Sequence, residues 1–408
     1  MGDSFDLGRV AAGGKPATLT LPDGASTPPA DATAIAPVPA SLTEPLRLEA
    51  PTPPQQLSED DALALVRVER ESIARLDVIV AEFIVAIMKL DTRDPKLAER
   101  STDVRNLGND ALRDSSEIAA RLLERTVGWL VRGGPAASSS INDGIVALRR
   151  EADRLNPRDR GDLAGSRKLL GFIPMGDKIN AYFARYQSSQ ADVNAVLLGL
   201  QVSQVDLRQD NVNLERDRVK LVSVISDLRH FVYLAQRLDA TLAERVLRSD
   251  GSDPERARIM RDDMLASVRM KHHDLSSHLA LAVQSYLTVA VMERNNLELI
   301  RGLEAAKVAI LSAMRTAIAV AQSMIDLRLV LDQITMLNDA ALGSAVPNAA
   351  SGDLSPLQLA FEGVYRRVDE IDAWRSASTV AMTATGVALQ SLADRTKGAP
   401  QRSTRGAR

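Results

Sequence analysis

A chain of 408 residues has room for two or three ordinary domains, or for one extended domain with tails. Hydrophobic residues make up 45% but aromatic residues only 3%, a balance that suits contacts between helices better than a β-sandwich or barrel. The chain has no cysteine, which excludes disulfides, thiolate catalysis and Cys-ligated zinc or iron–sulfur sites. Its net charge of −3 predicts no general attraction to nucleic acid.

Residues 1–57 are predicted to form a disordered tail. They hold ten of the 18 prolines, and such a segment buries too little apolar surface to offset the entropy of ordering. A flexible extension is the favoured interpretation, and a Pro-rich docking ligand is the alternative. The first residues, Met1-Gly-Asp-Ser-Phe-Asp6, lack the basic start and apolar core of a signal peptide.

Residues 58–157 are predicted to form a small N-terminal unit of three helices. Ser58-Glu-Asp-Asp61 has the pattern of a helix N-cap, and apolar residues then recur three and four apart. Asp94-Pro95 separates the first helix from the second, and Gly133-Gly-Pro135 separates the second from the third. A turn-rich connector follows at 158–174.

The stretch from Pro174 to Leu342 is predicted to form a long antiparallel helical hairpin, because Pro254 is the only proline after its start. Asp253-Pro254 has the pattern of a helix start and places the turn. In the first arm, sixteen positions alternate three and four residues apart, and twelve of them are apolar. They are Val193, Leu197, Leu200, Gln204, Leu207, Asn211, Leu214, Arg218, Leu221, Ile225, Leu228, Val232, Ala235, Asp239, Leu242 and Val246.

The four polar residues in this series are interpreted as fixing the register, with a buried polar site as the alternative. A last helix begins at Ser355-Pro356 and is predicted to pack along the hairpin. The predicted fold is therefore all-α: an elongated antiparallel coiled-coil or helical bundle at 175–395, built on two very long helices and ending in a basic disordered tail at 396–408. The most apolar window, Leu279 to Met292, is shorter than the ~20 residues that a membrane span needs.

No catalytic, metal-binding or cofactor-binding motif stands out. Gly-rich phosphate loops, nucleophile elbows and helical His-Glu-x-x-His pairs are absent from the sequence. His273 and His278 are five residues apart, which does not place them on one helical face, so solvated side chains are favoured over a metal site.

A polar cluster in the second arm is the candidate site. Arg294, Arg301 and Arg315 are seven and fourteen residues apart and approximate one stripe, beside Asn295 and Asn296. These five residues could bind an oxyanion. The favoured interpretation is structural, with the arginines pairing with acids on the antiparallel arm, for example near Glu215 or Asp206.

Several motifs occur in a fixed order between residues 165 and 395. They include Ile173-Pro-Met-Gly-Asp-Lys178, Tyr186-Gln-Ser-Ser-Gln190, Asn295-Asn-Leu-Glu-Leu-Ile300 and Leu329-Val-Leu-Asp-Gln-Ile334. With these motifs the chain resembles the toxic anion resistance (TelA-like, tellurite resistance) proteins of bacteria over residues 165–395. Met175 and Ser285 depart from the family pattern, which has Phe and Gly there. The resemblance implies a cytoplasmic protein linked to tellurite resistance and to cell-envelope or antimicrobial stress, with no established catalytic residues to carry over.

These observations favour a non-enzymatic scaffold that acts through protein partners or self-association, without a cofactor and without nucleic acid. One alternative is a direct oxyanion binder that uses the arginine stripe. Another is a coiled-coil protein that attaches peripherally to the inner face of the membrane.

Overall fold

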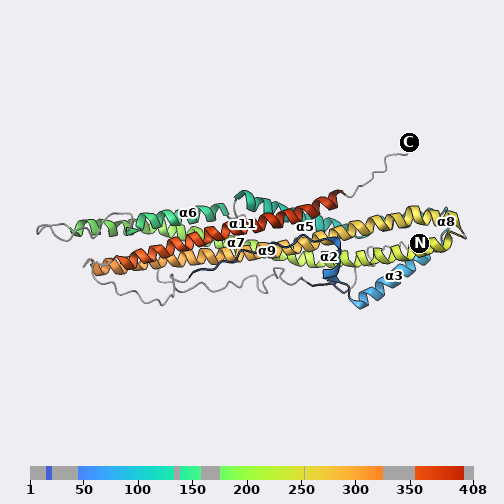
Figure 1. The fold of residues 1–408 in the computed structure, drawn as a ribbon, viewed down its shortest axis with the longest axis horizontal. Helices are drawn as coiled ribbons and strands as arrows, with labels where there is room; N and C mark the ends of the chain where they lie inside the picture. Colours follow the sequence, from blue (N-terminus) through green and yellow to red (C-terminus); the bar gives the residue numbers. More distant parts are fainter. Residues whose placement is uncertain are drawn as a thin grey trace, which may run out of the picture.

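A computed structural model describes residues 15–20, 45–132, 138–157, 175–251, 253–324 and 354–398. Most of its helices lie along one long axis and form an elongated bundle (Figure 1), which confirms the predicted all-α fold. Within the described ranges, the β-structure is one short antiparallel pair, β1 (Thr18–Leu19) with β2 (Val66–Arg67). The predicted connector at 158–174, the end of the return helix beyond residue 324 and the tail from 399 lie outside these ranges.

Two long antiparallel helices form the centre of the bundle, α7 (Met175–Ser249) and α9 (Ala266–Met324). The chain turns between them through α8 (Pro254–Ile259) and a π-helical turn, η2 (Met260–Leu265), at one end of the rod (Figure 1). Asp253 caps α8, and its Oδ1 accepts a hydrogen bond of 3.1 Å from the backbone N–H of Arg256. The turn therefore lies where the Asp-Pro pair predicted it.

The predicted seam of α7 is the buried face that packs against α9. Its leucines at seven-residue spacing are fully buried, namely Leu200, Leu207, Leu214, Leu221 and Leu228. Three of the polar residues in the series form hydrogen bonds with α9: Gln204 Nε2 donates to the Ile300 carbonyl at 3.1 Å, Asn211 Nδ2 donates to the Glu293 carbonyl at 3.4 Å, and Asp239 accepts from Arg269 at 2.8 Å. These bonds fit the expectation that polar positions set the register of the two arms.

The third long helix, α11 (Ser355–Gly398), packs along α9. α5 (Asn109–Arg132) lies against α7, α9 and α11, and α6 (Ser138–Leu155) lies against α7 and α11 (Figure 1). The core is accordingly rich in Leu, Ile, Val and Ala. Because α11 extends to Gly398, the first residues assigned to the basic tail at 396–408 are helical.

The region 58–157 differs from the predicted three-helix unit. It contains α2 (Glu59–Leu65), α3 (Arg70–Met88), α4 (Lys96–Asn106), α5 and α6, and these helices pack on the long hairpin or on α11. The longer ones, such as α3 and α5, carry an apolar stripe, and the long helices of the hairpin cover it. The prediction of three helices for this region is therefore wrong, because its described part contains five.

Residues 45–57 also differ from the predicted disordered tail. Leu46 and Leu57 are buried, and the backbone N–H of Leu57 donates to Gln284 Oε1 on α9 at 3.1 Å. Trp374 Nε1 on α11 donates to the carbonyl of Glu49 at 3.1 Å. Side chains of the bundle thus satisfy an extended backbone that lacks secondary structure of its own, which composition alone does not reveal.

Gly108, between α4 and α5, is required by its backbone and by its neighbours. Its φ is +68°, and a Cβ there would lie 2.8 Å from Phe231 Cδ2 and 3.0 Å from Leu275 Cδ2.

We expect Gly108→Ala to lower the free energy of unfolding by about 1–3 kcal/mol, because it combines backbone strain with a steric clash. Gly199→Ala is the matched control, since a Cβ on this exposed α7 residue meets nothing within 4 Å. It should raise the free energy of unfolding by up to about 1 kcal/mol. Equal urea midpoints for the two variants would contradict this account of Gly108.

Candidate functional site

The predicted arginine stripe on α9 faces the extended segment at 45–50. Arg294 Nη2 lies 2.5 Å from Glu49 Oε2, and Arg301 Nη1 donates to the carbonyl of Arg47 at 3.0 Å. Arg315 lies fourteen residues beyond Arg301, about 21 Å along the helix axis. Two arginines of the stripe therefore hold a segment of their own chain.

The two asparagines of the predicted site point to different neighbouring helices. Asn295 is fully buried, and its Oδ1 accepts a bond of 2.8 Å from Ser378 Oγ on α11. Asn296 Nδ2 donates to Asn211 Oδ1 at 2.8 Å and to Asp210 Oδ2 at 3.0 Å, both on α7. Residues 294–296 thus contact three different parts of the molecule and do not converge on one ligand.

Glu293 is the ionisable group at the centre of this polar region, and sequence analysis did not single it out as a functional residue. Its side chain is fully buried, and among the described residues neither carboxylate oxygen has a hydrogen-bond partner. Arg218 Nε on α7 lies 4.0 Å from Glu293 Oε1, and Arg218 also pairs with Glu215. Burial raises the pKa of Glu293 to about 7; Arg218 opposes this rise and Glu215 adds to it.

Polar side chains continue along α9 on either side of Glu293. Gln284 accepts the bond from Leu57 already described, while Thr288 Oγ1 donates to the carbonyl of Gln284 at 2.9 Å. Asp210, which bonds Asn296, also accepts a bond of 2.6 Å from Arg125 on α5. We call Asn211, Gln284, Glu293, Asn295 and Asn296 the central polar layer. It joins α9 to α7, α11 and the segment at 45–57, and therefore fixes their positions relative to one another.

The histidines lie nearer the turn of the hairpin. Burial lowers the pKa of His230 and His272, and lowers that of His278 to about 4, so these imidazoles are neutral at pH 7. Lys271 beside them has a pKa lowered by burial to about 8, and its Nζ donates to Asn109 Oδ1 at 2.5 Å. Across the described ranges, no group of three His, Asp or Glu side chains is placed to hold a metal ion.

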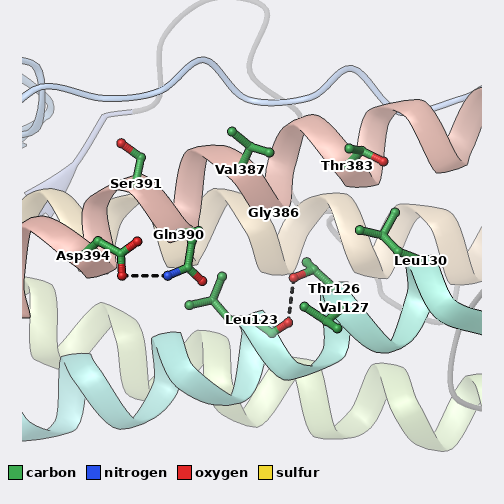
Figure 2. A pocket seen from close by; sticks show the side chains of 10 residues that line it. All are labelled: Leu123, Thr126, Val127, Leu130, Thr383, Gly386, Val387, Gln390, Ser391 and Asp394. Atoms are coloured by element: carbon green, nitrogen blue, oxygen red, sulfur yellow. Dashed lines mark hydrogen bonds between the residues drawn. The ribbon is translucent and has the colours of Figure 1, made fainter.

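A largely apolar groove of about 400 Å³ lies between α5 and α11 (Figure 2). Its two internal polar bonds stay within single helices: Thr126 donates to the Leu123 carbonyl, and Gln390 donates to Asp394. The groove was missed from the sequence because its walls come from helices more than 250 residues apart. They are formed by Leu123, Thr126, Val127, Leu130, Thr383, Gly386, Val387, Gln390, Ser391 and Asp394.

The fold and the polar layer define an elongated all-α bundle whose buried ionisable groups lie at helix contacts. Its sequence matches the model of the toxic anion resistance protein (TelA) family over residues 94–341, and the chain belongs to this family. Searches of curated proteins and of solved structures give no significant match. The family match includes α4, α5 and α6, which precede the region of the resemblance noted from the sequence. No described helix is long and apolar enough to cross a membrane.

The buried carboxyl of Glu293 should make stability depend on pH. A folded-state pKa of about 7, above the ordinary 4.5, means that its contribution to stability is full below pH 4.5 and is lost as the pH rises through 7. The glutamine in the Glu293→Gln variant cannot ionise, so this variant does not lose stability in this way as the pH rises. From pH 4.5 to pH 8 the unfolding free energy of the variant should therefore rise relative to wild type, by up to roughly 3 kcal/mol.

Urea denaturation at several pH values measures this difference. The two proteins differ only at residue 293, so the contributions of all other groups cancel in the comparison. Glu124→Gln, a substitution on the exposed face of α5, is the matched control. A difference between Glu293→Gln and wild type that stays constant across this range would show that Glu293 is not buried as described.

Proposed function

We propose that this protein is a non-enzymatic helical scaffold that acts in resistance to toxic anions such as tellurite, through contacts with protein partners or with copies of itself. The proposal rests on one observation: four residues of the predicted anion site bind other parts of their own chain. Arg294 and Arg301 bind residues 47–49 of their own chain, and Asn295 and Asn296 bind α11 and α7. These polar groups connect elements of the bundle, which is a structural role and fits a scaffold.

The role in toxic anion resistance comes from the family to which the chain belongs. Thiol-based reduction or sequestration of tellurite by this chain is excluded because it has no cysteine. Apolar surfaces also support a scaffold, since the groove between α5 and α11 exposes Val127 and Val387 by more than half of their area. Exposed apolar surface of this kind favours protein contacts.

A direct oxyanion binder is the second candidate, and one contact favours it. The carboxylate of Glu49 on Arg294 is chemically similar to a bound oxyanion, and both side chains are substantially exposed. An exposed ion pair of this kind contributes only about 0–1 kcal/mol, so an anion in solution could replace the carboxylate.

Calorimetry with tellurite, selenite or phosphate separates the two candidates. For the scaffold we expect no heat of binding from wild type and none from Glu49→Gln, which removes the competing carboxylate. A direct binder would instead bind more tightly in Glu49→Gln than in wild type, and would lose binding in Arg294→Gln. Saturable heat that follows this order would overturn the scaffold proposal.

A cellular assay tests the role itself. In cells that depend on this protein for tellurite resistance, we expect an Arg294→Gln/Arg301→Gln variant to preserve resistance if its abundance is unchanged. Loss of resistance at normal abundance would favour the direct binder, because the scaffold does not need a free arginine stripe.

We place this function in the cytoplasm, and peripheral attachment to the membrane through the basic segment at 396–408 is the alternative. Liposome flotation compares the full chain with a chain that ends at residue 395. With vesicles that contain anionic lipid we expect neither chain to float. Flotation of the full chain alone would support membrane attachment through this segment.

A further inference from the structure

α7 carries a second stripe at coiled-coil spacing, on the face opposite its buried contacts. Eight positions again alternate four and three residues apart, and all eight are exposed. Five of them are apolar. The stripe consists of Leu198, Val202, Val205, Gln209, Val212, Arg216, Val219 and Ser223.

The exposure of the apolar members is large and continuous. Leu198, Val202, Val205, Val212 and Val219 are 45–63% exposed. Four of them, Leu198, Val205, Val212 and Val219, are seven residues apart, which is the spacing of the buried leucines. The stripe extends over about 37 Å of helix from residue 198 to residue 223.

Such a stripe is unfavourable on a helix that faces only water. Valine is a weaker helix former than Ala, Leu, Glu or Lys, because its branched side chain loses rotamer freedom. Single exposed apolar residues need no explanation, but an exposed row with a seven-residue period has the pattern of a contact between helices. The stripe therefore matches the surface that another helix covers.

We propose that the stripe binds the same stripe of a second copy of this chain, with the two α7 helices antiparallel. This inference rests on the proposed scaffold function and names a partner for it. The register that gives the longest overlap places Val202 opposite Val219 of the other copy, and Val205 opposite Arg216. Each of these residue pairs then forms twice, as two-fold symmetry requires.

Charges beside the stripe favour this orientation. In the antiparallel register, exposed Arg208 lies opposite Glu215 of the second copy, and the same pair forms again by symmetry. A parallel pair in register would place Arg216 against Arg216, which is repulsive. In the antiparallel pair, Arg216 faces Val205 and its guanidinium can extend to solvent.

The mass of the full chain in solution tests the interface. We expect sedimentation equilibrium to show a dimer at micromolar concentration. Val205→Glu/Val212→Glu should weaken dimerisation at least tenfold while the circular dichroism spectrum and Tm stay within the range of the control. Val78→Glu, at an exposed valine of α3, is the control that should dimerise normally. A wild-type monomer at 100 µM, or an undiminished dimer in the double variant, would overturn the proposal.

Disulfide formation tests the orientation, because the chain has no other cysteine. An equal mixture of Val205→Cys and Arg216→Cys chains should form crosslinked dimers that contain one chain of each kind. Val205→Cys alone should remain uncrosslinked, and efficient crosslinking of this variant with itself would overturn the antiparallel arrangement. Neither measurement involves an anion, so failure to dimerise overturns this inference alone, and heat upon tellurite addition overturns the proposed function alone.

Discussion

The burial of one apolar face of α7 against α9 is the constraint on which the other contacts depend. Its leucines recur every seven residues from Leu200 to Leu228, and each is removed from water. A fully buried leucine contributes about 1.5–3 kcal/mol relative to an exposed one. Loss of a single contact is therefore tolerable, but a shift of register would displace every layer at once. The surrounding helices α3, α5, α6 and α11 pack on this pair.

The central polar layer complements this apolar contact because hydrophobic burial alone is weakly directional. Asn211 bonds the carbonyl of Glu293 and the side chain of Asn296, and no neighbouring register offers the same pair of partners. Asn295 defines the position of α11 in the same way through Ser378. The cost of this specificity is visible at Glu293, whose carboxyl is buried without a hydrogen bond among the described residues and whose pKa is raised to about 7.

The long hairpin and its turn were predictable because their signals are local: proline spacing, an Asp-Pro cap and a regular apolar period. Contacts between segments far apart in sequence were not. Nothing in residues 45–57 indicates that Arg294 would hold Glu49, since the partner residues are 245 positions apart. The pairing suggested with Glu215 fails for a related reason, because Glu215 pairs with Arg218 one turn away on its own helix. Local periodicity predicts helices, whereas the side-chain pairs between distant segments depend on how those helices are arranged in space.

The shape of the bundle also explains why it keeps apolar residues on its outside. A rod built from a few long helices has more surface for its volume than a sphere, so a smaller share of each helix is covered within one chain. α7 is covered along its leucine seam, yet its opposite face keeps Val205 and Val212 at the same seven-residue interval. α7 therefore has two apolar faces with the same seven-residue period, and only the leucine seam is buried within the chain. In the dimer that we propose, a second copy covers the other face without a change in the helix itself, which is a simple way for such a rod to become part of a larger assembly.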